Sequence, residues 1–264
     1  MNDIGPPTDW QDCELDCARC PNSELKAQER CQLGLACVHD RYAKRIDRFF
    51  FWNQGLAKDF LEHPYFEVRA VAAKHVDVFH LPRLLDDPDE TVRGSAAIRL
   101  PAKQLLKLVF DPHREVRIRV AARLDPHDLG AMISDPDYYV RQVVAKRLPD
   151  SLLTLMMHDE EPDVRCVIAS RISEAMLPNM ARDEDAGVRR EVARRMKPSQ
   201  LQILLDDPDW RVRYEVASRA DQNHLRHLAN DEDELVRDIV RQRLGPATGD
   251  VSQLLVQKPA PQGF

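Results

Sequence analysis

Apolar residues recur along most of the chain with a period of 24 residues. The dipeptide Val-Arg begins at residues 68, 92, 116, 140, 164, 188, 212 and 236, and every step between them is 24 residues. Eight units aligned on this dipeptide follow one another from residue 63 without an insertion. A fixed period of this length is the sequence signature of a repeat protein. We therefore predict stacked repeats rather than one large globular core.

Within each unit, apolar residues fall at positions 6, 10, 11 and 14. In the unit that begins at Asp135 they are Val140, Val144, Ala145 and Leu148. At about 100° per residue, these positions cover one face of a helix. The unit opens with Asp in seven of eight cases. We expect this Asp to be the helix N-cap, and the Pro that often follows to be the first helical residue. The helix should end near position 14, where Pro often comes next.

The rest of each unit carries a second, shorter pattern. Leu or Met occupies positions 19 and 22, as in the pairs Leu105 with Leu108 and Leu153 with Met156. A spacing of three in so short a segment indicates a single helical turn or a 3₁₀ helix. No run has the period of two that marks a strand. Because one unit cannot bury its apolar face alone, the pattern predicts an all-α solenoid in which stacked units share a core.

Two columns of arginine accompany the apolar pattern. Position 7 is Arg in all eight units and lies within the apolar arc of the helix. A buried guanidinium must be paired, so we expect it to bind Asp at position 1 or 3, or free carbonyls, in the same or an adjacent unit. The alternative is a column that binds an anionic partner through its guanidinium groups.

Position 13 is Arg in seven units and lies at the edge of the apolar face. It is either part of a solvated helix flank or an exposed stripe that binds a partner. The candidate binding residues of this stripe are Arg99, Arg123, Arg147, Arg171, Arg195 and Arg219.

Composition and charge narrow the function. The 264 residues are 43% hydrophobic and 31% charged, with a formal net charge of −6. Binding of nucleic acid through phosphates needs clustered Lys and Arg, so we do not expect a nucleic-acid partner. The longest apolar runs are far shorter than the roughly 20 residues of a membrane helix. The first residues lack the features of a secretory signal, so we expect a cytoplasmic protein with no membrane partner.

Five of the six cysteines lie within the first 37 residues, with the spacing C-x3-C-x2-C-x10-C-x5-C. Without an export signal, such crowding indicates a metal site rather than disulfides. Four thiolates can hold an iron–sulfur cluster or a structural zinc ion. The segment has no pair of CxxC motifs, which weakens the argument for a zinc site. Pro21 directly after Cys20 is similar to the Cys-Pro of ferredoxin sites, which favours an iron–sulfur cluster. We predict a [4Fe–4S] cluster. The alternatives are a structural zinc ion and cysteines that are simply reduced or disulfide-linked.

The predicted ligands are Cys17, Cys20, Cys31 and Cys37. Cys17 and Cys20 form the tightest chelate. Cys13 lies in an acidic stretch that disfavours a further thiolate, and it is kept as a substitute for Cys31 or Cys37. The first three cysteines also resemble the radical-SAM motif, but that class places its motif in a strand-rich barrel, which this pattern does not predict.

The segment after Cys37 carries two further groups of side chains. The basic residues Arg41, Lys44, Arg45 and Arg48 stand at helical spacing, and they either stabilise an anionic cluster or form a solvated helix face. Aromatic residues are concentrated between residues 49 and 66. We expect these rings to cover the open end of the solenoid.

The unit DPDxxVRxxVAxRL, with the cysteine-rich segment in front of it, resembles the leucine-rich repeat variant family over about residues 13–245. The resemblance implies alternating α and 3₁₀ helices in a right-handed superhelix, preceded by a small N-terminal iron–sulfur domain. It also implies a link to nitrogen-fixing bacteria and no established biochemical activity. We expect three parts: a cluster module and N-terminal cap at residues 1–62, eight repeats at residues 63–245, and a disordered tail at residues 246–264.

No catalytic constellation emerges from the sequence. The nine histidines are scattered, and the chain has no Ser-centred elbow, Gly-rich phosphate loop or HExxH motif. We therefore expect no catalytic residues and no enzyme activity. The preferred function is a protein-interaction scaffold with a redox-sensing or structural cluster. The alternatives are an electron-transfer protein and a nucleic-acid-binding protein that uses the arginine columns. No oligomeric state is predicted.

Overall fold

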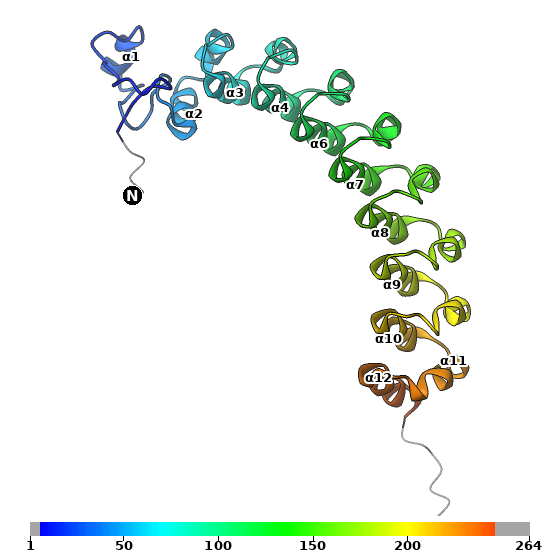
Figure 1. The fold of residues 1–264 in the computed structure, drawn as a ribbon. Helices are drawn as coiled ribbons and strands as arrows, with labels where there is room; N and C mark the ends of the chain where they lie inside the picture. The colour runs from blue at the N-terminus through cyan, green and yellow to red at the C-terminus, as the bar shows by residue number, and fades with distance from the viewer. Residues whose placement is uncertain (1–5, 246–264) are drawn as a thin grey trace, which may run out of the picture. The chain divides into compact units, whose positions relative to one another are not determined.

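The computed structural model describes residues 6–245, whose regular structure is helical (Figure 1). Strand-like pairing in this range is limited to two isolated bridges, Thr8 with Glu14 and Gln32 with Ala36. No helix among these residues combines the length and the apolar character needed to cross a membrane. The predicted tail at residues 246–264 lies outside the described residues.

The chain forms two units, Met1–Pro149 and Asp150–Phe264. With η denoting a 3₁₀ helix, the first contains α1 (Ser23–Ala27), α2 (Ala43–Trp52), η1 (Gln54–Phe60), α3 (Phe66–His75), η2 (Val78–Leu84), α4 (Glu90–Arg99), α5 (Ala102–Leu105), η3 (Leu106–Leu108), α6 (Arg114–Arg123), η4 (Pro126–Met132) and α7 (Tyr138–Arg147). The second contains η5 (Asp150–Met156), α8 (Pro162–Arg171), η6 (Glu174–Met180), α9 (Ala186–Arg195), η7 (Pro198–Leu204), α10 (Trp210–Arg219), α11 (Gln222–His227), η8 (Leu228–Asn230) and α12 (Glu234–Leu244).

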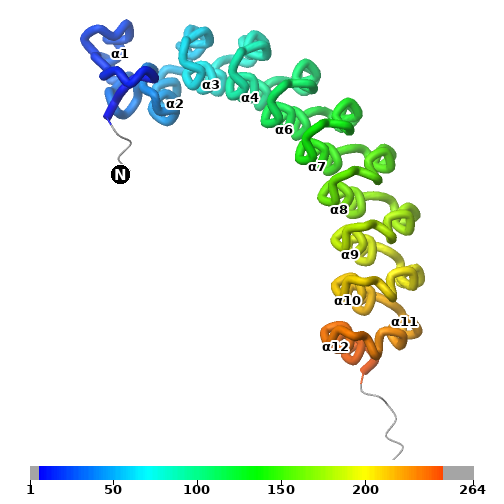
Figure 2. The backbone as a smooth tube through the Cα atoms, viewed as in Figure 1, coloured from blue at the N-terminus to red at the C-terminus, as the bar shows by residue number. Residues whose placement is uncertain are grey.

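Each repeat pairs one α helix with one short 3₁₀ segment, as the spacing predicts. Within the first unit, α3, α4, α6 and α7 pack side by side in chain order (Figure 2). Within the second unit, α8, α9, α10 and α12 do the same. In two repeats a short α turn, α5 or α11, comes before the 3₁₀ turn. The predicted all-α solenoid of alternating α and 3₁₀ helices is confirmed.

The structure extends the repeat pattern one step further toward the N-terminus than the sequence register does. Helix α2 packs on α3, and η1 follows α2 as η2 follows α3. The η1 segment begins 24 residues before η2. Residues 43–60 thus form a degenerate repeat that the missing Val-Arg dipeptide concealed. The boundary at residues 62 and 63 stays a prediction.

The start of each helix differs from the prediction. The N-cap is position 3 and not position 1: Asp89 accepts a hydrogen bond from the backbone N–H of Thr91 at 2.8 Å, and α4 begins at Glu90. The Asp at position 1 lies outside the helix, where Asp87 accepts the backbone N–H of Asp89 at 2.9 Å. Asp is a good cap at either place. With position 3 as the cap, the carboxylate at position 1 can make a contact between repeats.

The predicted apolar positions form the core. In the repeat that begins at Asp87, the side chains of Val92, Ala96, Ala97 and Leu100 are fully buried. The paired residues at positions 19 and 22 are buried as well, from Leu81 and Leu84 to Leu225 and Leu228. The small Ala at position 11 lets neighbouring α helices approach closely.

Arginine at position 7 links one repeat to the next. Arg93 donates from Nε and Nη2 to the two carboxylate oxygens of Asp111, at 2.7 and 2.9 Å. Its Nη1 donates to the carbonyls of Asp87 and Pro88, at the start of its own repeat. The same bidentate contact joins Arg69 to Asp87, Arg117 to Asp135, Arg165 to Asp183, Arg189 to Asp207 and Arg213 to Asp231. The predicted internal pairing is confirmed.

Arginine at position 13 makes a second link, back toward the preceding repeat. Nη1 of Arg99 donates to the carbonyls of Ala73 and Val76, at the C-terminus of α3, at 2.8 and 2.5 Å. Arg123, Arg147, Arg195 and Arg219 donate in the same way to the alanine carbonyl 26 residues earlier. Arg171 forms an ion pair with Asp150 at 2.8 Å. All of these arginines except Arg171 thus cap the C-terminus of the preceding α helix rather than forming a solvated flank.

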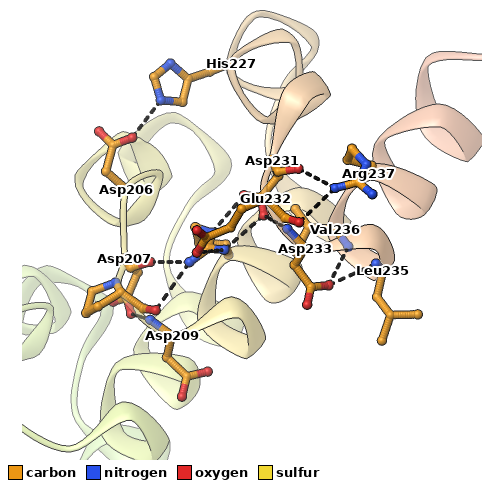
Figure 3. Close-up of polar contacts among 12 residues, drawn as sticks. Asp206, Asp207, Asp209, His227, Asp231, Glu232, Asp233, Leu235, Val236 and Arg237 are labelled. Atoms are coloured by element: carbon orange, nitrogen blue, oxygen red, sulfur yellow. Dashed lines mark hydrogen bonds and ion pairs between the residues drawn. The ribbon is translucent and has the colours of Figure 1, made fainter.

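The last repeat has only part of this network (Figure 3). Arg213 donates both to the carboxylate of Asp231 and to the carbonyls of Asp207 and Pro208. Arg237 occupies the same position one repeat later. Its contacts among the described residues are the carbonyls of Asp231 and Glu232, at 2.6 and 2.9 Å.

We predict that Arg213→Ala lowers the free energy of unfolding by about 3 kcal/mol, because it leaves the buried carboxylate of Asp231 without its cation. The matched substitution Arg237→Ala should cost about 1 kcal/mol, since it removes hydrogen bonds to carbonyls alone. Urea denaturation followed by helical circular dichroism measures both. Equal losses would contradict the assignment of the ion pair as the main link between repeats.

A second prediction concerns acid. Burial by itself would raise the pKa of Asp111, but hydrogen bonds from Arg93 and from the backbone N–H of His113 outweigh it and lower the pKa. The unfolded chain has an ordinary Asp pKa of about 3.9. The stabilisation is therefore fully present above about pH 5 and is lost as the pH falls through the folded pKa. Thermal unfolding between about pH 2 and 7 should show this loss, and Asp111→Asn should make the dependence shallower. An unchanged slope in the variant would refute the linkage.

Candidate iron–sulfur site

The cysteines predicted as ligands lie on mostly irregular backbone before α2. Cys17 and Cys20 precede α1, while Cys31 and Cys37 flank the bridge between residues 32 and 36. Helix α1 has five residues and buries none of its side chains. The segment around α1 therefore contributes little apolar core of its own, and polar contacts hold it in place.

Helix α2 and the residue that follows it hold the loop of residues 30–37 in place. Arg48 donates to the carbonyl of Leu35 at 3.3 Å, and Asn53 donates to the carbonyl of Arg30 at 2.8 Å. The backbone N–H of Cys37 donates to a carbonyl of α2 at 3.2 Å. These contacts anchor the loop at both ends, so that the positions of its two cysteines depend on α2.

Three of the four predicted ligands line one cavity of about 210 Å³, and the fourth lies beside one of them. Cys17, Cys20 and Cys37 line it, and Cys31 joins them through a hydrogen bond between its sulfur and that of Cys37. The charges of Cys17 and Cys20 also act on the thiol of Cys31. The remaining walls are Asp9, Trp10, Leu15, Asp16, Pro21, Leu33 and His39.

The structure separates the other two cysteines from this group. Cys13 is exposed, does not line the cavity, and has its sulfur 3.8 Å from the carbonyl oxygen of Gln11. Cys166 lies on α8 in the second unit. The geometry favours the predicted set of four, with Cys13 outside it.

Burial and the neighbouring thiols set the protonation of the cysteines. Burial raises the pKa of Cys20. The hydrogen bond with Cys31, together with burial, raises the pKa of Cys37, and the same hydrogen bond lowers the pKa of Cys31. Iron binds thiolates, so assembly of a cluster here releases protons and offsets the cost of burying the sulfur atoms.

The basic residues of α2 and the segment before it clamp the module and do not line the cavity. The side chain of Arg45 pairs with buried Asp40 at 2.9 Å, and Arg41 pairs with Asp12. Arg48 binds the loop carbonyl described above, and Lys44 is exposed. Their main contribution in the structure is to tie the cysteine segment to α2.

This donor set fits an iron–sulfur cluster, which four cysteine thiolates hold. Within residues 6–245, no three cysteine, histidine or carboxylate side chains converge closely enough to hold a single metal ion. The fit therefore rests on the shared cavity and the contacts between sulfurs. In addition, the backbone N–H of Asn22 donates to the sulfur of Cys20 at 3.4 Å. Hydrogen bonds of this kind tune the reduction potential of a cluster.

Sequence reasoning missed three side chains that shape the site. Trp10 and His39 are walls of the cavity, and Asn53 anchors the loop that carries Cys31. The position of Trp10 and His39 at the two ends of the cysteine run was the available signal. Asn53 gave none, because its contact joins residues 23 positions apart.

Known proteins resemble both parts of the chain. Residues 7–59 match a family model described as the FeS4 cluster of LRV proteins. A solved structure, described as a leucine-rich repeat variant with a novel repetitive structural motif, is 41% identical with a TM-score of 0.83. The match covers 87% of this chain and 98% of that one.

A protein of Rhodobacter capsulatus, named an uncharacterized 27.7 kDa protein in the nifB 3′ region, is also similar. It is 52% identical over 99 residues, which are 37% of this chain and 40% of the relative. The matched part thus spans less than half of the relative's length.

Fold, cysteine cavity and family model together define a helical-repeat protein that carries an iron–sulfur cluster, and the cluster is of the [4Fe–4S] type. The chain belongs to the leucine-rich repeat variant family. The predicted family, fold class and cofactor are confirmed.

We predict that replacing any one of Cys17, Cys20, Cys31 or Cys37 by Ser removes most of the cluster, because each thiolate is the protein ligand of one iron atom. Cys13→Ser and Cys166→Ser are the matched controls and should keep it. Iron content and visible absorbance after anaerobic purification measure the outcome. A cluster that survives in one of the four variants but is lost with Cys13→Ser would move the ligand set to Cys13.

Proposed function

We propose that the protein is a non-enzymatic interaction scaffold of the cytoplasm whose [4Fe–4S] cluster senses redox state or stabilises the N-terminal end. The observation that carries the proposal is the division between the inside and outside of the repeats. The buried positions repeat with little change, while position 8 is exposed at Arg190 and Tyr214 and partly exposed at Gln142, three unlike residues. A stack of repeats with a uniform core and a varied surface suits recognition of a protein partner.

Exposed aromatic side chains support this proposal. Phe79 on η2 is 86% exposed, and Phe110, two residues after η3, is 83% exposed. Tyr138 and Tyr139 are also exposed, at the start of α7. Aromatic residues are enriched among the anchors of protein interfaces. We extend the proposal to nitrogen fixation, because the name of the Rhodobacter capsulatus relative places it beside nifB.

Capture of partners from the native host tests the scaffold. The full chain is immobilised with its cluster intact, with its cluster removed, and as a Tyr138→Ser, Tyr139→Ser double variant. We expect specific partners on the intact protein, fewer on the cluster-free protein, and a loss on the double variant without a change in iron content. Identical captured proteins in all three samples would refute a partner surface on α7 and its dependence on the cluster.

An electron-transfer role is the second candidate, and one observation favours it. Cys17 and Cys20 are only partly buried, so a cluster on their sulfurs would lie close to the surface. Electron transfer requires the cluster to cycle reversibly between two oxidation states. Repeated reduction and oxidation, followed by the visible absorbance of the cluster, tests this role: loss of the cluster in the first cycle excludes an electron carrier.

Nucleic-acid binding through the arginine columns receives no such support. The guanidinium groups described above already donate to carboxylates and carbonyls within the fold. The net charge of −6 also opposes binding to phosphates.

A further inference from the structure

His63 occupies a position that is Asp in the seven other repeats. The carboxylate of Asp87, for example, has two roles: it accepts the backbone N–H of Asp89, and it binds Arg69 of the preceding repeat. His63 keeps the first role, because its Nδ1 accepts the N–H of Tyr65 at 3.1 Å. Its carbonyl also accepts Nη1 of Arg69, as the carbonyl at position 1 does elsewhere.

His63 does not take over the second role, which is to bind the arginine of the preceding repeat. The residue 24 positions before Arg69 is Arg45, and its side chain pairs with Asp40 in the cysteine module. The ring of His63 instead packs against Trp10, with ring centres 5.0 Å apart, and against His39, with centres 5.9 Å apart. Both of these neighbours belong to the cluster module.

The neighbours of His63 are walls of the cysteine cavity. Trp10 and His39 line it together with Cys17, Cys20 and Cys37. Trp10 also stacks on Tyr65 at 5.7 Å, two residues beyond His63.

A chain of contacts leads from His63 to one of the predicted ligand sulfurs. His39 is hydrogen-bonded to the side chain of Asn22 at 3.2 Å. The backbone N–H of Asn22 donates to the sulfur of Cys20. The first repeat thus reaches the cluster site through His39 and Asn22.

An Asp at residue 63 would not suit this place. Burial and the neighbouring His39 lower the pKa of His63 to about 4, so its ring is neutral at pH 7. A carboxylate here would be a half-buried negative charge near an anionic cluster, and Asp40 already holds the arginine that could have paired with it. A neutral ring can pack against Trp10 and His39 at no such cost.

We propose that His63 is a positioning residue for the cluster: its ring holds Trp10 and His39 against the first repeat and thereby keeps the cysteine cavity in shape. The inference rests on the cluster and not on the partner binding proposed above. His63 contacts no predicted ligand, and it acts through the two walls.

The test compares three variants of the full chain. His63→Asp introduces the residue of the other repeats, and His63→Asn keeps a neutral acceptor for the N–H of Tyr65 but lacks the ring. Asp87→Asn is the matched control, because it weakens the Arg69 contact one repeat later and touches no wall of the cavity. Anaerobic transfer of iron to a ferrous chelator gives the rate of cluster loss, and helical circular dichroism gives the thermal stability.

We expect both His63 variants to lose the cluster about tenfold faster than the wild-type protein, as substitutions behind metal ligands commonly do. Asp87→Asn should lower the melting temperature and leave the rate of cluster loss unchanged. Wild-type rates in both His63 variants, or an equal acceleration in Asp87→Asn, would overturn the proposal.

A double variant decides the case in which His63→Asp does not fold. If His63 acts through Trp10, then His63→Asn combined with Trp10→Leu should lose the cluster no faster than Trp10→Leu alone. If the two substitutions instead multiply each other's effect on the rate of cluster loss, the route through Trp10 is refuted. The wild-type sample in the same series reports whether the cluster is present, so failure of this inference is separate from failure of the scaffold proposal.

Discussion

The buried pair of arginine and aspartate between successive repeats is the constraint on which the rest of the structure depends. One guanidinium edge of Arg93 binds carbonyls at the start of its own repeat, and the other binds Asp111 of the next. Removal of either partner leaves a charge in an environment with little water. The pair also explains the unbroken period, because an inserted residue between Arg93 and Asp111 would move the carboxylate away from the fork. Position 13 adds a link in the opposite direction, so within each unit arginines bind a repeat both to the one before it and to the one after it.

Such a network must end, and the two ends of the chain differ. Arg237 keeps its carbonyl contacts and has no carboxylate partner among residues 6–245. At the other end, Arg45 turns to Asp40, and His63 stands where the carboxylate would be. The cluster module therefore does not imitate a repeat at this contact. In place of the arginine–aspartate pair, the module contacts the first repeat through the packed rings of Trp10, His39 and His63.

Periodicity predicted what depends on one helix at a time: the buried positions, the 3₁₀ segments and the need to pair the arginine at position 7. It placed the helix cap at the wrong residue, because Asp stands at both position 1 and position 3 and only backbone geometry separates them. The contacts of Arg99 could not be read from its own repeat, since its acceptors are the carbonyls of Ala73 and Val76. The four cysteines were recognisable by spacing. The packing of Trp10 on His63 was not, because it joins residues 53 positions apart with no periodic signal.

The cysteine module has too little apolar material to fold by burial alone. Its helix α1 buries no side chain, and its loops are held mainly by single hydrogen bonds to α2. Small domains of this kind need a metal or a disulfide to compensate for the lost chain entropy. Four iron–thiolate bonds would supply that stabilisation, so we expect cluster occupancy and folding of the module to be coupled. Because Trp10 and His39 line the cavity and contact His63 of the first repeat, we expect this coupling to extend to the beginning of the solenoid.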